Sequence, residues 1–244
     1  MISERQLSKY FHSFWKHHFP MLDTTYVKRF NAENKERLLN AYGGVVLPVP
    51  MGETVERYDL VSELAFELAR ESYQAGTSRG PDHDEAKTRA EITIARLKAG
   101  PDIMPTTPDE VAEADALVKI YNAFFATLAG EPEFHFRPRI KGAGILNQME
   151  ADFVDSETLY EVKAVNRNLQ YSDLHQVLCY LFCGLGSKEY SWTRYCIFNP
   201  RQAVYYSGSI SDLLEYLSGR SADECIYNVL EALMEREQPL ESSF

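Results

Sequence analysis

The sequence predicts an α/β protein in which a central mixed β-sheet is flanked by helices and preceded by an N-terminal helical region. Two observations lead to this prediction. Apolar residues recur mostly at helical spacing up to Gly130 and then change to the alternating spacing of strands. Helical spacing returns at about 172–185 and after 209. We expect a helical region at 1–106 and a sheet-bearing core with C-terminal helices at 107–244.

Five helices are expected before the first strand. Ser3 and Gln6 have the spacing of a capping box ahead of the first. The fifth has the clearest start, because Thr107 suits the N-cap, Pro108 the first helical position and Glu110 the capping box. The middle three are expected at 33–42 before Gly43-Gly44, 53–75 before Gly76 and 83–99 before Gly100-Pro101, and the fifth is expected to run to Gly130.

Strands and helices alternate in the rest of the chain. Gly142-Ala143-Gly144 suits a tight turn or a close backbone approach. A helix is expected at about 172–185, with Ser172 as its N-cap and Asp173 in its first turn. Strands are expected at 133–136, 150–154, 159–165, 191–198 and 202–207, and short helices at 209–218 and 222–236.

Charge restricts the classes of function. A formal net charge of −11 disfavours a protein that coats nucleic acid non-specifically, because phosphate binding depends on Lys and Arg. Residues 134–206 differ from the rest, with eight Lys or Arg against seven Asp or Glu. The acidic surplus lies elsewhere, so we expect the acidic helical region to meet a protein partner or a second copy of the chain.

The cellular location is predicted from what the sequence lacks. No apolar run approaches the roughly 18 residues of a membrane helix, and the polar start does not have the order of a secretory signal. We therefore expect a cytoplasmic protein with no membrane partner. The four cysteines include no CxxC pair, which favours reduced core thiols.

The tripeptide Glu-x-Lys occurs three times, and its context distinguishes one copy. Two copies, at 33–35 and 85–87, lie in polar helical stretches, where surface charge is the simplest interpretation. Glu161-Val162-Lys163 interrupts an apolar strand instead. The period of two puts Glu161 and Lys163 on one face of that strand and Val162 on the other.

Asp152 strengthens the case for this third copy. A two-residue turn at Ser156-Glu157 would pair Asp152 directly with Glu161, with Cβ atoms ~4.5–5.5 Å apart. Like charges at that distance are destabilising, and a divalent cation such as Mg²⁺ relieves the repulsion through hard oxygen ligands. The alternative is that Lys163 merely neutralises a surface pair of carboxylates.

Residues 108–207 resemble the core of the PD-(D/E)XK nuclease superfamily. The shared order is a helix, strands that carry an Asp and then Glu-x-Lys, a helix and further strand. Gln176 and Tyr180 on the second helix resemble the Q-x-x-x-Y motif of the RecB-like branch, and at i and i+4 they share a helix face. Ala151 replaces the proline of the superfamily name. The resemblance implies a restriction-endonuclease-like core within 107–244.

The resemblance also implies an activity, the hydrolysis of DNA phosphodiester bonds with Mg²⁺ or Mn²⁺, in DNA repair or in restriction or anti-phage defence. RNA stays open as a substrate. Asp152, Glu161 and the carbonyl of Val162 would hold the metal, and Lys163 would act on water and phosphate. Gln176 and Tyr180 would fix the substrate strand. The expected phosphate contacts are Arg137, Arg139, Lys141 and Arg167. The candidates for a further metal ligand are Glu110, Glu113, Asp115, and either His83 or an acid from the earlier helices.

Two readings compete with an active nuclease. One is a nuclease-fold protein that has lost catalysis and serves as a nucleic-acid-binding or scaffold subunit, which the joint presence of Asp, Glu and Lys disfavours. The other is a helical interaction protein whose Glu-x-Lys is accidental. A structure without a central mixed sheet would establish the second reading.

Overall fold

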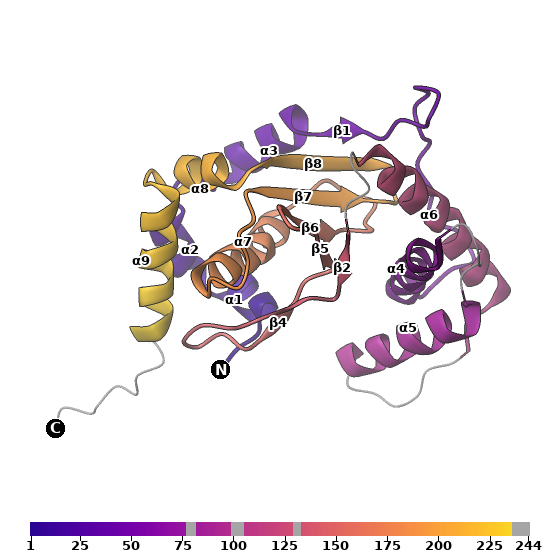
Figure 1. Ribbon diagram of the computed structural model, residues 1–244, viewed down its shortest axis with the longest axis horizontal. Coiled ribbons are helices and arrows are strands. Elements are labelled where there is room, and N and C mark those ends of the chain that lie inside the picture. The colour runs from indigo at the N-terminus through magenta and orange to yellow at the C-terminus, as the bar shows by residue number, and fades with distance from the viewer. Residues whose placement is uncertain (77–81, 99–104, 129–132, 236–244) are drawn as a thin grey trace.

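The computed structural model describes residues 1–76, 82–98, 105–128 and 133–235, and it confirms the predicted α/β class (Figure 1). The helices in the described residues are α1 (Glu4–Tyr10), α2 (His12–His18), α3 (Thr24–Glu33), α4 (Tyr58–Ala75), α5 (His83–Lys98), α6 (Pro108–Thr127), α7 (Tyr171–Gly186), α8 (Ile210–Ser218) and α9 (Ala222–Glu235). The strands are β1 (Glu36–Arg37), β2 (His135–Phe136), β3 (Arg139–Ile140), β4 (Met149–Glu150), β5 (Phe153–Val154), β6 (Thr158–Val162), β7 (Arg194–Asn199) and β8 (Val204–Ser209).

Within the described residues the main sheet is mixed and has six strands, in the order β1-β8-β7-β6-β5-β2. Strands β6 and β7 are parallel, and the other neighbours are antiparallel. Helix α7 connects the parallel pair, which requires a crossover of this kind. Strands β3 and β4 form a separate ribbon.

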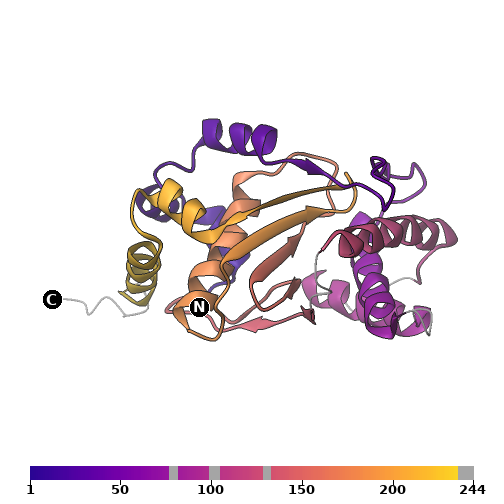
Figure 2. The same ribbon diagram turned by 45° about the horizontal axis from the view of Figure 1, so that its top comes forward.

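Two apolar cores lie on opposite faces of this sheet. Alternation along β6 sends Leu159 into one core and Tyr160 into the other, and along β7 it separates Ile197 from Phe198 in the same way. The first core contains α7 together with α1, α2, α3, α8 and α9, and the second contains α4, α5 and α6. Figure 2 shows these two groups of helices on either side of the strands.

Residues on both sides of the expected boundary at 106/107 contribute to both cores. Leu7 of α1 belongs to the same core as Leu178 of α7, and Leu64 of α4 to the same core as Leu117 of α6. The division into 1–106 and 107–244 stays a prediction.

The main departure from the predicted elements lies near residue 36. The expected helix at 33–42 is wrong, because the chain leaves α3 at Glu33 and forms β1, which pairs with β8 at the edge of the sheet. The Leu38 amide donates to the Ala203 carbonyl at 2.9 Å, so the sheet edge supplies the hydrogen bonds that a helix would have made. Helix α3 itself is not among the predicted helices, although Asp23 caps it by accepting from the Tyr26 amide at 2.7 Å.

The ends of the other helices agree better with the prediction. Thr107 and Glu110 form the expected capping box of α6. Helix α4 begins at Tyr58 rather than at 53. The prediction of Ser172 as the N-cap of α7 is wrong, because Gln170 occupies that position and its amide donates to Asp173 at 2.7 Å. Helix α6 ends at Thr127, with Leu128 as its C-cap in an extended conformation, so the expected run to Gly130 is too long. The helix end expected at Gly100-Pro101 lies outside the described residues.

The close backbone approach expected at Gly142 and Gly144 is present. A Cβ atom on Gly142 would lie 2.1 Å from the Leu146 carbonyl oxygen, and one on Gly144 would lie 2.1 Å from the Leu233 carbonyl oxygen. Gly144 also has a φ of +54°, which favours glycine. The approach at Gly142 lies within the β3–β4 connection, and the approach at Gly144 brings that connection against the end of α9.

The four cysteines are free and buried, in agreement with the prediction of core thiols. Among the described helices, none combines the length and apolar character that crossing a bilayer requires.

Candidate active site

A polar cavity of about 790 Å³ lies beside the C-terminal end of β6, where β6 faces α1, α4, α5 and α7. All five side chains that the sequence predicts to be catalytic line this cavity: Asp152, Glu161, Lys163, Gln176 and Tyr180. They come from the β5–β6 hairpin and from one face of α7. The topology therefore brings the two predicted motifs to one site.

The hairpin has the predicted register. Phe153 pairs with Tyr160 and Val154 with Leu159, which places Asp152 opposite Glu161. The Asp155 carboxylate fixes the turn by accepting from the amides of Glu157 and Thr158 at 2.8 and 2.7 Å.

The backbone also orients Asp152. One of its carboxylate oxygens, Oδ2, accepts from the Val162 amide at 2.6 Å, and its carbonyl accepts from the Arg137 amide at 2.9 Å. Two strands thus fix the position of this carboxylate at the cavity.

Lys163 joins the hairpin to α7. Its ammonium donates to Oε1 of Glu161 at 2.6 Å and to the amide oxygen of Gln176 at 2.7 Å. The Gln176 amide group in turn donates to the Tyr180 hydroxyl at 2.7 Å. The i, i+4 spacing of Gln176 and Tyr180 therefore places both on the cavity side of α7, as the sequence indicates.

Electrostatics at this point are dominated by burial, since the Glu161 and Lys163 side chains are only 4% and 14% exposed. Burial raises the pKa of Glu161 above its ordinary value, Lys163 opposes this, and Asp152 adds to it. Burial acts to lower the pKa of Lys163, but Glu161 and the more distant Asp173 and Asp152 outweigh it and leave the pKa raised. The carboxylates thus hold the ammonium charged, yet Glu161 still resists ionisation.

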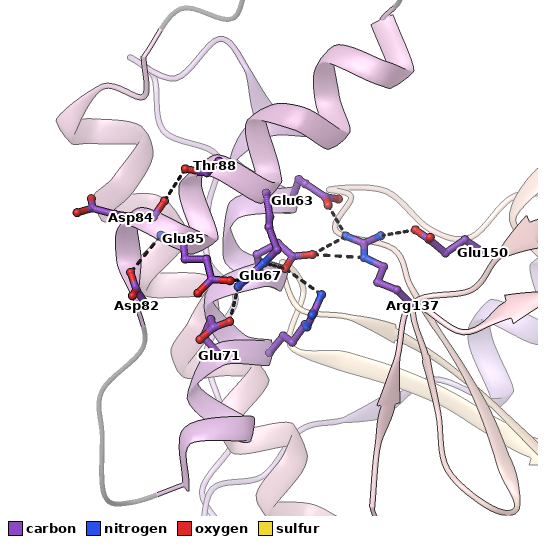
Figure 3. A network of polar contacts seen from close by, with 11 residues as sticks. Glu63, Glu67, Glu71, Asp82, Asp84, Glu85, Thr88, Arg137 and Glu150 are labelled. Atoms are coloured by element: carbon purple, nitrogen blue, oxygen red, sulfur yellow. Dashed lines mark hydrogen bonds and ion pairs between the residues drawn. The ribbon is translucent and has the colours of Figure 1, made fainter.

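Glu63 on α4 is a cavity residue that the sequence analysis did not single out among the acids of the earlier helices. Its side chain is 14% exposed and forms an ion pair with Arg137 (Figure 3). Burial raises the pKa of Glu63 to about 7; Arg137 opposes this shift, and Asp152 adds to it. Glu63 lies 89 positions before Asp152 and has no motif around it, so no local signal marks it.

Arg137 links α4 to the hairpin. Its guanidinium is 3.1 Å from Glu67 and 3.9 Å from Glu150, in addition to its pair with Glu63 (Figure 3). It also lies 3.9 Å from Asp152. One guanidinium is therefore shared by four carboxylates. Its charge lowers the pKa of Glu63 by less than burial and the neighbouring carboxylates raise it. The predicted role of Arg137 in phosphate binding stays a prediction; it lines the cavity with its guanidinium occupied by these pairs.

The same ionic network continues through Glu67 to α5 and holds that helix beside the cavity. Arg89 of α5 pairs with Glu67 at 2.8 Å and also with Glu71, both on α4. Glu67 is nearly fully buried, so its charge is compensated within the protein. Further along α5, Thr93 and Arg96 reach the cavity wall.

The other predicted phosphate contacts divide into two groups. Arg139 is exposed and lines the cavity. Lys141 is exposed and pairs with Glu189, and Arg167 forms two hydrogen bonds with Asp173 at 2.6 and 3.1 Å. Neither Lys141 nor Arg167 is among the residues that line the cavity.

Two arginines that were not predicted do line it. Arg5 comes from α1 and Arg96 from α5, and both are exposed. Each becomes a candidate for phosphate binding only because the fold brings these helices to the hairpin.

The four named candidates for a further metal ligand lie elsewhere. Glu110 pairs with Arg57, Nε to Oε1, at 2.8 Å. Glu113 pairs with the buried Arg201 at 2.8 Å and accepts from the Gly52 amide at 2.7 Å. These contacts are structural, and none of the four candidates, Asp115 and His83 included, lines the cavity.

The donor atoms at the hairpin suit a hard divalent cation. Asp152 and Glu161 supply carboxylate oxygens and Val162 a carbonyl, without sulfur or imidazole. Mg²⁺ commonly takes one or two carboxylates and keeps several waters. Across the described residues, no group of three or more His, Cys, Asp or Glu side chains that could hold a metal occurs, so the set stops at two carboxylates. Two carboxylates and a carbonyl at one cavity are donors of the kind that Mg²⁺ accepts, and the residues therefore fit the ion that the resemblance implies.

Comparison with known proteins gave no further guide. No family model, curated protein or solved structure matches this chain.

Proposed function

We propose that this protein is a metal-dependent nuclease of the PD-(D/E)XK superfamily, RecB-like branch, that hydrolyses phosphodiester bonds of DNA. The observation that carries the proposal is the opposition of Asp152 and Glu161 in one hairpin, with Lys163 between Glu161 and Gln176. An accidental Glu-x-Lys has no reason to meet an Asp in register and a Q-x-x-x-Y face in one cavity. The helical-interaction alternative required a structure without a mixed sheet, and the sheet is present.

The metal would be held by Asp152, Glu161 and the Val162 carbonyl. When bound, Mg²⁺ or Mn²⁺ supplies a Lewis acid for the phosphate and lowers the pKa of a bound water. Asp152 is already oriented by the Val162 amide, so its carboxylate is pre-positioned for such a role.

Lys163 is the residue suited to act on water and phosphate. Its raised pKa keeps it an ammonium at neutral pH, which favours orientation of the water and charge stabilisation over proton abstraction. Gln176 accepts from that ammonium and is therefore a positioning residue. Tyr180 accepts from Gln176, which leaves its own hydroxyl hydrogen for a substrate oxygen. Arg5, Arg96 and Arg139 surround this point with positive charge suited to the flanking phosphates.

The test is incubation of the purified protein with linear, circular and single-stranded DNA, with Mg²⁺, Mn²⁺ or excess EDTA. Lys163→Met removes the ammonium while keeping a side chain of similar length. Lys35→Met is the matched control, because Lys35 also ends a Glu-x-Lys and also donates to a glutamine, Gln202, at 2.9 Å.

Metal-dependent cleavage by the wild type and by Lys35→Met, and none by Lys163→Met, is the expected result. Equal cleavage by Lys163→Met would contradict the assignment. A folded wild type that binds Mn²⁺ in a calorimetric titration but cleaves no DNA or RNA would favour the inactive scaffold.

A further inference from the structure

A second cavity, a groove of about 770 Å³, lies next to the candidate active site along helices α1 and α7. On α7, Ser172 lines this groove and Gln176 lines the active-site cavity, and four residues of helix separate their Cα atoms by ~6 Å along the axis. On α1, Arg5 lines the active-site cavity and Lys9 lines the groove. The two cavities thus lie within about one or two helical turns of each other.

The lining of this groove combines an apolar floor with a basic rim. Buried apolar side chains form the floor, namely Trp15, Phe19, Val27 and Leu169. Exposed cations stand around it, namely Lys9, Lys16 and Lys28, with His12 between the first two. The one acid in the lining is Asp23, which is engaged as the N-cap of α3.

This basic rim is unusual for the chain. Residues 1–33, which include α1 to α3, contain five Lys or Arg and three Asp or Glu, whereas the whole chain carries −11. Positive charge in an acidic protein is thus concentrated on α1 to α3, beside the candidate active site. Such a patch is complementary to a polyanion that continues from one cavity into the other.

We infer that the groove binds a single-stranded flank of the substrate, a few nucleotides from the bond to be cleaved. This inference rests on the proposed nuclease function. Single-strand binding sites combine cations that follow the phosphates with apolar and aromatic surfaces that receive the bases, and the groove has both. Its volume is that of a small-ligand pocket, which suits one or two unpaired nucleotides and excludes a base-paired duplex.

Tyr171 is the residue best placed to receive a base. It lines the groove, is half-buried, and its hydroxyl is held by the Thr24 hydroxyl at 2.6 Å. Trp15 is less available, because its indole stacks on His175 with ring centroids 4.0 Å apart and is 4% exposed. In this inference the single-stranded nucleic acid places its phosphates beside the three lysines and one of its bases against Tyr171.

Fluorescence anisotropy tests this inference without cleavage. Labelled single-stranded and hairpin oligonucleotides would be titrated in EDTA with the wild type and with the triple variant Lys9→Glu/Lys16→Glu/Lys28→Glu. Lys119→Glu is the control, because Lys119 is an exposed lysine of α6 that lines neither cavity. Thermal melts check that each variant is folded.

The triple variant should bind the single strand about tenfold or more weakly, with a smaller loss for the hairpin. Each single Lys→Ala should reduce the slope of log K against log salt by about 0.7. Tyr171→Ala should weaken single-strand binding with an unchanged slope. Wild-type affinity in the triple variant, or an equal loss in Lys119→Glu, overturns the inference.

Cleavage assays in Mg²⁺ separate this inference from the proposed function. If the wild type binds through the lysines but cleaves nothing, the groove stands and the nuclease proposal fails. If the wild type cleaves DNA and the triple variant binds and cleaves as well as the wild type, the nuclease proposal stands and the groove is not a binding site for the single strand.

Discussion

Lys163→Met tests whether the buried lysine compensates a carboxylate pair built for a cation. The substitution removes the ammonium 2.6 Å from Glu161 and leaves that carboxylate 4% exposed without its partner. Breaking a buried ion pair in this way costs about 3–5 kcal/mol. Protonation of Glu161, whose pKa is already raised, limits the loss, so we expect about 3 kcal/mol near pH 8 without metal.

The assay is a thermal melt with and without Mg²⁺. For a chain of this size, 1 kcal/mol corresponds to about 2–4 °C, so the melting temperature should fall by about 6–12 °C in EDTA. Mg²⁺ at about a hundredfold excess over its dissociation constant contributes about 2.7 kcal/mol. Mg²⁺ should therefore restore most of the lost stability of Lys163→Met. It should raise the melting temperature of the variant by at least as much as that of the wild type, since the variant lacks the positive charge that competes with the ion.

Two results would refute this reasoning. Lys163→Met could melt with the wild type in EDTA, which would mean that the ammonium compensates no buried charge. Alternatively, Mg²⁺ could leave both melting temperatures unchanged, which would make the Asp–Glu–Lys cluster purely structural. Lys35 is half-buried and lies away from the cavity. The control Lys35→Met should therefore lower the free energy of unfolding by only about 1 kcal/mol and should leave the response of the melting temperature to Mg²⁺ unchanged.

Four other outcomes are expected. Cleavage should stop in excess EDTA and return with Mg²⁺ or Mn²⁺, because the donors are hard oxygens; full activity in EDTA would contradict this. Gln176→Ala should lower the cleavage rate ~10- to 100-fold, because Lys163 loses the hydrogen bond that positions its ammonium. The melting temperature should fall by about 2–6 °C. Wild-type kinetics in this variant would show that Gln176 does not position Lys163. Glu63, with a pKa of about 7 in place of 4.5, takes up a proton on folding, so its own contribution to metal-free stability is fully present below about pH 4.5 and is lost, by roughly 3 kcal/mol, as the pH rises through 7. Glu63→Gln should remove that part of the pH dependence, and parallel stability curves for variant and wild type would argue against it. Gly144→Ala should cost about 2–4 kcal/mol, because its Cβ would meet the Leu233 carbonyl oxygen at 2.1 Å, and an unchanged denaturation midpoint would refute this.

The parts of the site that could be predicted are those set by local geometry. The period of two along β6 fixes the faces of Glu161 and Lys163, and a short turn fixes the partner of Glu161. The helical period does the same for Gln176 and Tyr180. Each of these rules acts within one element or one hairpin, so the relative positions of these side chains can be predicted without knowledge of the overall fold.

The residues that could not be predicted meet through long-range packing. Glu63, Arg5 and Arg96 reach the cavity from three helices that are distant from the hairpin in sequence. Their positions depend on which face of the sheet each helix covers. The same reason explains why Lys141 and Arg167, although near the motif in sequence, are paired away from the cavity.

The fold near β1 shows the same limit. Residues 33–42 have helical spacing, but the open edge of β8 offers hydrogen bonds that no local pattern reveals. Tertiary context decided between the two structures.

The pairing of β1 with β8 also has a consequence for the order of events during synthesis. Glu36 pairs with Tyr205, and Leu38 with Ala203, so the edge of the sheet closes only after most of the chain has been translated. Contacts of such separation slow folding, because a long loop must close before they stabilise anything. The β5–β6 hairpin and α7 likewise emerge well after α1 and α4, which complete the cavity wall. A ribosome-bound fragment that stops before α7 therefore lacks Gln176, Tyr180 and the last strands. We expect such a fragment to lack the proposed cleavage activity, because the cavity is completed only in the nearly finished chain.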